Sequence, residues 1–196
     1  MNLIGTHASF GARRPVVIST TWNPSDKGAN CTLTNGDLTA SLNTIAQNDG
    51  CRSILGVSSG KWYFEFTIAG AAGTEMVGVS GTVWDRTALL GKTSDSYSYY
   101  GNNGQKRNNN AGSSYGDTFG NGDIISVLLD MDAGTLTFWK NGVSQGQAFS
   151  GIGATMYAAF GGGSGSAAES VTANFGAAPF VYTPPAGYHH GLGRLA

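Results

Sequence analysis

Hydrophobic and polar residues alternate with a period of two along several segments of the chain. The segment 62–68 reads Trp-Tyr-Phe-Glu-Phe-Thr-Ile, so its even-numbered residues share one face of a strand and its odd-numbered residues the other. The segments 125–131, 136–138 and 171–175 repeat this pattern, whereas no long window keeps the apolar spacing of a helix. Turn residues interrupt the strands about every 8–12 positions, which is typical of an all-β sandwich or barrel.

Two dipeptides predict hairpins with a defined turn. Asn35-Gly36 and Asn141-Gly142 each lie next to a run with strand character. A type I′ turn needs positive φ at both central residues, and Asn-Gly adopts that conformation readily. A third turn, at residues 132–134, joins the strands on either side of it, so the chain from 124 to about 150 is predicted to form a three-stranded meander.

Glycine and charge narrow the class of protein. Glycine accounts for 31 of 196 residues, and only 12% of the residues are charged, with a formal net charge of -1. Most glycines fall in predicted turns, which explains their number without invoking disorder. The low charge excludes a nucleic-acid binder that works by electrostatics. No apolar stretch approaches the roughly 18 residues of a membrane span, so no membrane insertion is expected.

Other segments are predicted to be less regular. Residues 91–122 are rich in Ser, Tyr, Asn and Gly, and we interpret them as a strand pair turning at 102–104, followed by a long loop.

No secretory signal is recognised near the N-terminus. Cys31 and Cys51 are too few for a disulfide framework and are expected to be reduced and buried, with a single bridge across adjacent strands left open.

Six motifs, in order along the chain, resemble those of the SPRY domain family. They lie at residues 60–66 with 77–79, 99–106, 122–130, 135–149, 157–160 and 171–180. The resemblance implies a bent antiparallel β-sandwich of two sheets, of the concanavalin-like jelly-roll type. It also implies a non-enzymatic module that binds partners through loops at one edge. It runs from about residue 22 to about 182, so we divide the chain into an N-terminal arm (1–20), a SPRY domain (21–183) and a C-terminal tail (184–196).

A solitary SPRY chain with little charge and many Gly, Asn and Ser residues is similar to those that bacteriophages encode as virion parts. This analogy predicts a virion protein of the tail, tail-fibre tip or capsid surface, assembled in the host cytoplasm. Its partners would be other virion proteins in an oligomeric assembly, and a host surface glycan or protein. Two alternatives remain: a structural decoration or adaptor subunit held by its terminal arms, or an intracellular peptide-binding adaptor.

The sequence offers no convincing catalytic or metal site. Residues 56–60 fit the G-x-S-x-G pattern, but that motif needs a helix after the serine, and here a strand follows. All three histidines lie in the terminal arms. Asp130 and Asp132 share one face of a strand and could bind Ca²⁺, or they could simply accept hydrogen bonds from backbone amides of the turn. We therefore predict no enzyme activity, no resident metal and no cofactor.

The candidate binding residues are aromatic and polar side chains between positions 84 and 107. Aromatic rings beside amides and hydroxyls suit carbohydrate or protein recognition. Alternation places Tyr97 and Tyr99 on one face and Tyr100 on the other, and the resemblance makes Tyr99 or Tyr100 a counterpart of the family's binding tyrosine. One or two of these rings could instead cap the core, and the basic pair could be part of a solvated turn. The predicted set is Trp84, Asp85, Arg86, Tyr97, Tyr99, Tyr100, Lys106 and Arg107.

Overall fold

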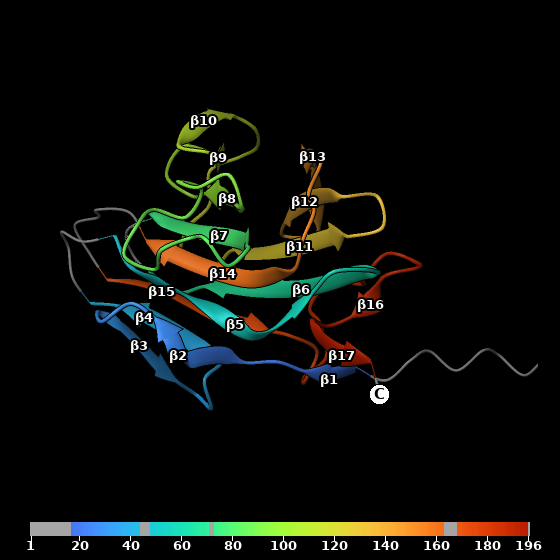
Figure 1. Cartoon of the computed structure of the whole chain (residues 1–196), viewed down its shortest axis with the longest axis horizontal. Coiled ribbons are helices and arrows are strands. Elements are labelled where there is room, and N and C mark those ends of the chain that lie inside the picture. Colours follow the sequence, from blue (N-terminus) through green and yellow to red (C-terminus); the bar gives the residue numbers. More distant parts are fainter. Residues whose placement is uncertain (1–16, 44–47, 71–72, 163–167, 196) are drawn as a thin grey trace, which may run out of the picture.

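A computed structural model describes residues 17–43, 48–70, 73–162 and 168–195 (Figure 1). The described chain contains strands and turns but no helix, so no described segment could cross a membrane as a helix. Two large antiparallel sheets pack face to face, as the sequence predicted. The first sheet contains, in order across it, β10 (Ala111–Ser114), β9 (Gln105–Asn108), β8 (Ser96–Tyr100), β7 (Glu75–Ser80), β14 (Met156–Gly162), β5 (Gly50–Val57) and β2 (Trp22–Lys27).

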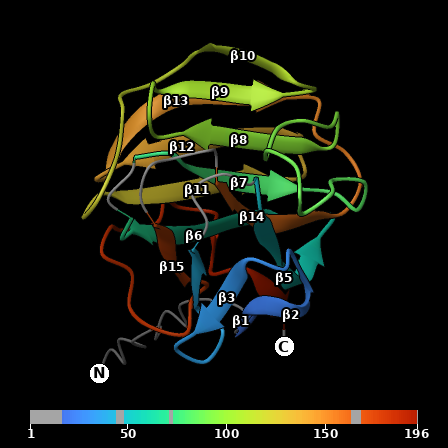
Figure 2. The same cartoon turned by 90° about the vertical axis from the view of Figure 1, so that its left-hand side faces the viewer.

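The second sheet supplies the other layer of the sandwich. It contains, in order, β13 (Val143–Ser150), β12 (Thr135–Lys140), β11 (Ile124–Asp130), β6 (Lys61–Ile68), β15 (Glu169–Asn174), β4 (Thr39–Leu42) and β3 (Cys31–Thr34). β8 to β10 and β12 to β13 rise at the same side of the molecule in Figures 1 and 2. Tyr115 Oη donates to the carbonyl of Gly146 at 2.5 Å and so ties this end of the first sheet to β13.

The alternating pattern of β6 is confirmed, and side chains on both of its faces are buried. Phe64 and Phe66 point into the core between the sheets, where Phe66 stacks on Trp22 with 5.6 Å between ring centroids. Tyr63 and Glu65 lie on the outer face and are buried as well. The chain after β15 crosses that face, and the backbone amides at 181 and 182 each donate to the Glu65 carboxylate at 2.9 Å.

The predicted hairpins form, with one difference in length. Asn141-Gly142 joins β12 directly to β13 with φ of 49° and 78°, the expected two-residue turn. Asn35-Gly36 lies in a wider turn, because Thr34 pairs with Thr39 and four residues separate the strands.

The strand pair predicted to turn at 102–104 is confirmed, since β8 pairs with β9 and Tyr100 lies opposite Gln105. The long loop predicted to follow that pair is wrong, because β10 forms a further hairpin with β9. Asn109 and Asn110, with φ of 51° and 60°, make its turn. Asparagine tolerates this left-handed conformation better than most residues, but without a glycine the pair gives a weaker signal.

Both described chain ends pair with other strands. β1 (Val17–Ser19) pairs with β17 (Gly193–Leu195), and β16 (His189–His190) runs parallel to β6. The predicted tail, 184–196, therefore includes strands that belong to the folded body. Most of the predicted arm, 1–20, lies outside the described residues, and the division of the chain at 20 and 183 stays a prediction.

Both cysteines are free and buried, as expected. Cys31 belongs to the second sheet and Cys51 to the first, so they are not on adjacent strands of one sheet. Burial, together with the neighbouring Cys31 thiol, raises the pKa of Cys51 well above its ordinary value.

Candidate functional site

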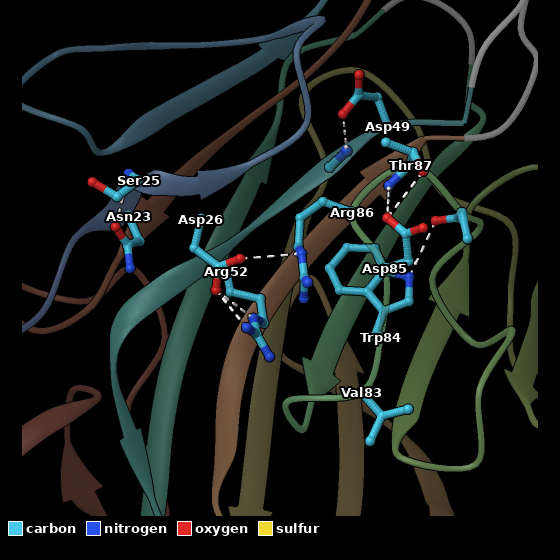
Figure 3. A network of polar contacts seen from close by, with 12 residues as sticks. Asn23, Ser25, Asp26, Asp49, Arg52, Val83, Trp84, Asp85, Arg86 and Thr87 are labelled. Carbon is cyan, nitrogen blue, oxygen red and sulfur yellow. Dashed lines mark hydrogen bonds and ion pairs between the residues drawn. The ribbon is translucent and has the colours of Figure 1, made fainter.

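The segment between β7 and β8 crosses the outer face of the first sheet, and we call residues 81–95 the crossing loop (Figure 3). Trp84 anchors it. Its ring is fully buried against Met76 and Leu90, in a cluster separate from the main core. Its indole Nε1 donates to the carbonyls of residues 88 and 89, at 3.1 Å each. Trp84 therefore fixes the loop and presents no ring to a partner.

A polar network connects the crossing loop to the strands beneath it (Figure 3). The Asp26 carboxylate accepts a hydrogen bond from Arg52 Nε at 2.8 Å and pairs with Arg52 Nη2 at 2.5 Å. Arg86 Nε approaches the other oxygen of the same carboxylate at 3.1 Å. Arg52 also donates to the carbonyl of Gly81, at the start of the loop. One carboxylate thus joins two guanidinium groups, and with them β2, β5 and the loop.

Charges of both signs act on Arg86. Burial and the neighbouring Arg52 lower the pKa of Arg86, and Asp26, Asp85 and Asp95 only partly offset them. Nη1 of Arg86 is buried and has no hydrogen-bond partner. The guanidinium lies 5.6 Å from the centre of the Trp84 ring, close enough for a cation–π contact.

Asp85 supports the turn that displays Arg86. Its Oδ1 accepts hydrogen bonds from the backbone amide and the hydroxyl of Thr87, both at 2.9 Å. These bonds lower the pKa of the exposed Asp85 carboxyl, so it stays ionised. A short self-bonded turn of this kind holds the loop in one shape.

The three predicted tyrosines have different positions. Tyr99 is fully buried in the main core, where it packs on Phe119 with 4.8 Å between ring centroids. Tyr97 is half-buried on the same face, whereas Tyr100 is half-buried against the Trp84 cluster on the opposite face. Tyr97 and Tyr99 thus share one face and Tyr100 lies on the other, as predicted. The alternative, in which one of these rings fills the core, is confirmed for Tyr99.

Lys106 and Arg107 lie in β9, not in a solvated turn. Lys106 Nζ donates to the carbonyl of Ala148 and lies 5.4 Å from the centre of the Phe149 ring. It links β9 to β13 at the end of the sandwich. Arg107 is half-buried. The partner-binding role given to the eight predicted residues stays a prediction, but Trp84 and Tyr99 lie inside the molecule.

Sequence reasoning missed three residues of this region: Asp26, Arg52 and Val83. Asp26 and Arg52 are 26 residues apart, and only the pairing of β2 with β5 brings them together. Val83 is 72% exposed beside the buried Trp84. An isolated valine in a turn-rich segment gives no sequence signal for such a position.

The G-x-S-x-G match and the pair of Asp130 and Asp132 have structural roles. Residues 58–60 form the turn between β5 and β6, and a strand follows it. Asp130 Oδ1 accepts hydrogen bonds from the backbone amides of residues 132 and 133, and Asp132 accepts one from that of Gly60. Within the described part of the chain, no three metal-binding side chains lie together.

Comparison with known proteins identifies the family. The family model of the SPRY domain matches residues 61–178. The chain belongs to the SPRY domain family. The SPRY domain of human HERC1 superposes with a TM-score of 0.69 and 26% sequence identity, over 78% of this chain and 96% of that one. A second human SPRY domain superposes with a TM-score of 0.61 at 21% identity, which supports the fold. The predicted family and fold are both confirmed.

Two of the curated relatives are Ran-binding proteins of animals. Ran-binding protein 9 of Xenopus tropicalis is 31% identical over 170 residues, covering 82% of this chain and 31% of the relative. The Ran-binding proteins 9/10 homolog of Drosophila melanogaster is 29% identical over 170 residues, covering 82% of this chain and 18% of the relative. The chain thus spans about a fifth to a third of the length of these relatives. Nothing in the comparisons supports the predicted virion role or a glycan ligand, whereas a protein-binding module agrees with them.

Proposed function

We propose that this SPRY chain is an intracellular adaptor domain that binds a short segment of a partner protein. The surface that binds is the part of the crossing loop at residues 82–87, together with Arg52 and Asp26 beneath it. SPRY domains are in general protein-interaction modules, and the chain has the fold of one. Two free, buried cysteines agree with a reducing compartment, where thiols stay unpaired.

The observation that carries the proposal is the fixed shape of a loop with an exposed apolar tip. Trp84 and the Asp26 network hold the loop from below, so little conformational entropy is lost when a partner binds. Val83 projects from this base with most of its surface in solvent. Arg86 and Asp85 lie beside it and supply charge. Loops on a rigid scaffold are where binding residues concentrate.

The names of the curated relatives describe binding of Ran. The matched region is only part of each relative, so Ran is one candidate partner for this chain among others.

A peptide-display screen with the full chain tests the proposal. A library of random peptides shown on yeast would be enriched on the wild-type protein and then measured on Val83→Asp and Arg86→Ala. We expect both changes to weaken the enriched peptides about tenfold or more, because each removes one central contact.

The matched control is Val143→Asp. Val143 is 66% exposed, like Val83, but it lies on β13 of the other sheet. It should leave the affinities unchanged. The proposal is overturned if the library yields no peptide, or if the enriched peptides bind both loop variants as tightly as the wild type.

A further inference from the structure

A cleft of about 460 Å³ opens beside the crossing loop, and we call it the Asp95 cleft. It lies between the crossing loop and the turn that precedes β14. Val83 is an exposed large hydrophobic residue on its lining, and it stands apart from the polar network in Figure 3. The lining includes Val83, Asp95, Tyr97, Ala154, Thr155 and Met156.

Asp95 gives the cleft a negative charge. This charge raises the pKa of Arg86, but the two side chains form no ion pair. One oxygen accepts the backbone amide of Val83 at 2.7 Å, and the other accepts the hydroxyl of Thr93 at 2.5 Å. These are neutral donors, and among the ion pairs of the described residues none involves Asp95. No Lys, Arg or His lines the cleft. The carboxylate therefore retains capacity to accept a charged donor.

Tyr97 supplies an aromatic surface next to this charge. Its ring packs edge-on against Phe149, with 5.1 Å between centroids, and stays half-exposed toward the cleft. Burial raises the pKa of the Tyr97 hydroxyl, and the Asp95 charge raises it further, in keeping with their proximity. A cation that reaches Asp95 thus meets an aromatic ring as well.

The backbone has an unusual feature on each side of the cleft. At Gly81 a β-carbon would lie 2.6 Å from Asp95 Oδ2, so only glycine lets the carboxylate approach the loop this closely. On the opposite wall, Ala154 has a φ of 61°, in the left-handed region that alanine rarely adopts. Strained backbone of this kind clusters at binding sites.

We propose that the Asp95 cleft takes an arginine or lysine side chain from the partner segment. This inference rests on the proposed function and names the chemistry of one contact. The aliphatic stem of the side chain would lie along Val83 and Met156, and its charged head would reach Asp95 and the Tyr97 ring. An apolar side chain fits less well, because it would remove Asp95 from water without replacing the lost solvation.

Nuclear magnetic resonance with two capped amino acids tests the contact directly. The ¹⁵N-labelled full chain would be titrated with N-acetyl-arginine methylamide and with N-acetyl-norleucine methylamide, which has an uncharged side chain. We expect the arginine probe to shift the amide signals of Val83, Asp95 and Ala154 and to bind about tenfold more tightly than the norleucine probe.

Two variants make the test specific. Asp95→Asn keeps an oxygen that can accept the Val83 amide but removes the charge, and it should weaken the arginine probe about tenfold. Thr155→Lys places a tethered cation at the cleft and should also abolish probe binding. The control Asp117→Asn changes an exposed carboxylate elsewhere and should have no effect.

The proposal is overturned if the two probes bind equally, if Asp95→Asn binds the arginine probe like the wild type, or if the shifts lie elsewhere. The peptide screen separates this failure from that of the proposed function. Enriched peptides that depend on Val83 and Arg86 but show no preference for basic residues would retain the binding module and reject the cleft assignment.

Discussion

Replacing Trp84 with alanine should loosen the crossing loop and destabilise the whole domain. The change leaves a cavity in a fully buried cluster with Met76 and Leu90. It also removes the donor that serves the carbonyls of residues 88 and 89. Truncating a buried Trp to Ala costs about 3–5 kcal/mol of unfolding free energy. That is a large share of the roughly 5–15 kcal/mol that stabilises a typical domain.

Urea unfolding, followed by far-ultraviolet circular dichroism, measures this loss. The matched control is Trp139→Ala, because Trp139 is only half-buried, on the outer face of the second sheet. We expect the control to lose clearly less free energy. Hydrogen exchange should locate the effect of Trp84→Ala, with the amides of residues 81–95 exchanging faster. A loss under about 1 kcal/mol, with unchanged exchange in the loop, would refute the view that Trp84 fixes the binding surface.

Three further predictions concern other parts of the fold. Burial alone would raise the pKa of Asp130, but the Lys61 ammonium and two backbone amides lower it overall. Asp130→Asn should therefore destabilise the protein at neutral pH. Urea titrations should show that the difference in unfolding free energy between the wild type and this variant shrinks as the pH falls below about 4 and through the lowered pKa. Glu65→Ala should cost about 2–4 kcal/mol and speed hydrogen exchange of the amides at 181–182, which would lose their buried acceptor. Cys51 should resist a thiol reagent at pH 8 in the native protein and react in guanidinium chloride, since burial raises its pKa; rapid native labelling would contradict this.

Local patterns were sufficient to predict the strands and most turns. Alternation in 62–68 identified β6 and sorted its side chains onto two faces, and Asn141-Gly142 fixed a two-residue hairpin with the expected positive φ. The β9–β10 hairpin was missed because Asn109-Asn110 lacks the glycine that usually marks such a turn. The pairing of β1 with β17 was also missed, since strands of three residues are too short to show a period.

The candidate site was predicted only in part. The segment 84–86 was singled out as part of a binding site, and that role stays a prediction. The structure places the segment in the crossing loop, where the Arg86 guanidinium lies 5.6 Å from the centre of the Trp84 ring. Asp26 and Arg52 could not be found, because their meeting depends on long-range strand pairing. Val83 could not be found either, because its exposure follows from how the neighbouring Trp84 is buried.

Alternation assigns residues to two faces of a strand, but it does not say what covers each face. Around β7 and β8 of the first sheet both faces are covered: the main core takes Tyr99 on one side, and the crossing loop buries Trp84 on the other. The large rings that look suited to recognition are therefore used to build and fix the scaffold. The proposed contacts with a partner are therefore made by residues that the scaffold displays, which are Val83, Arg86 and the Asp95 cleft. A test of binding by Trp84→Ala would confuse lost structure with lost contact, whereas Val83→Asp and Asp95→Asn change the displayed surface and leave its anchor in place.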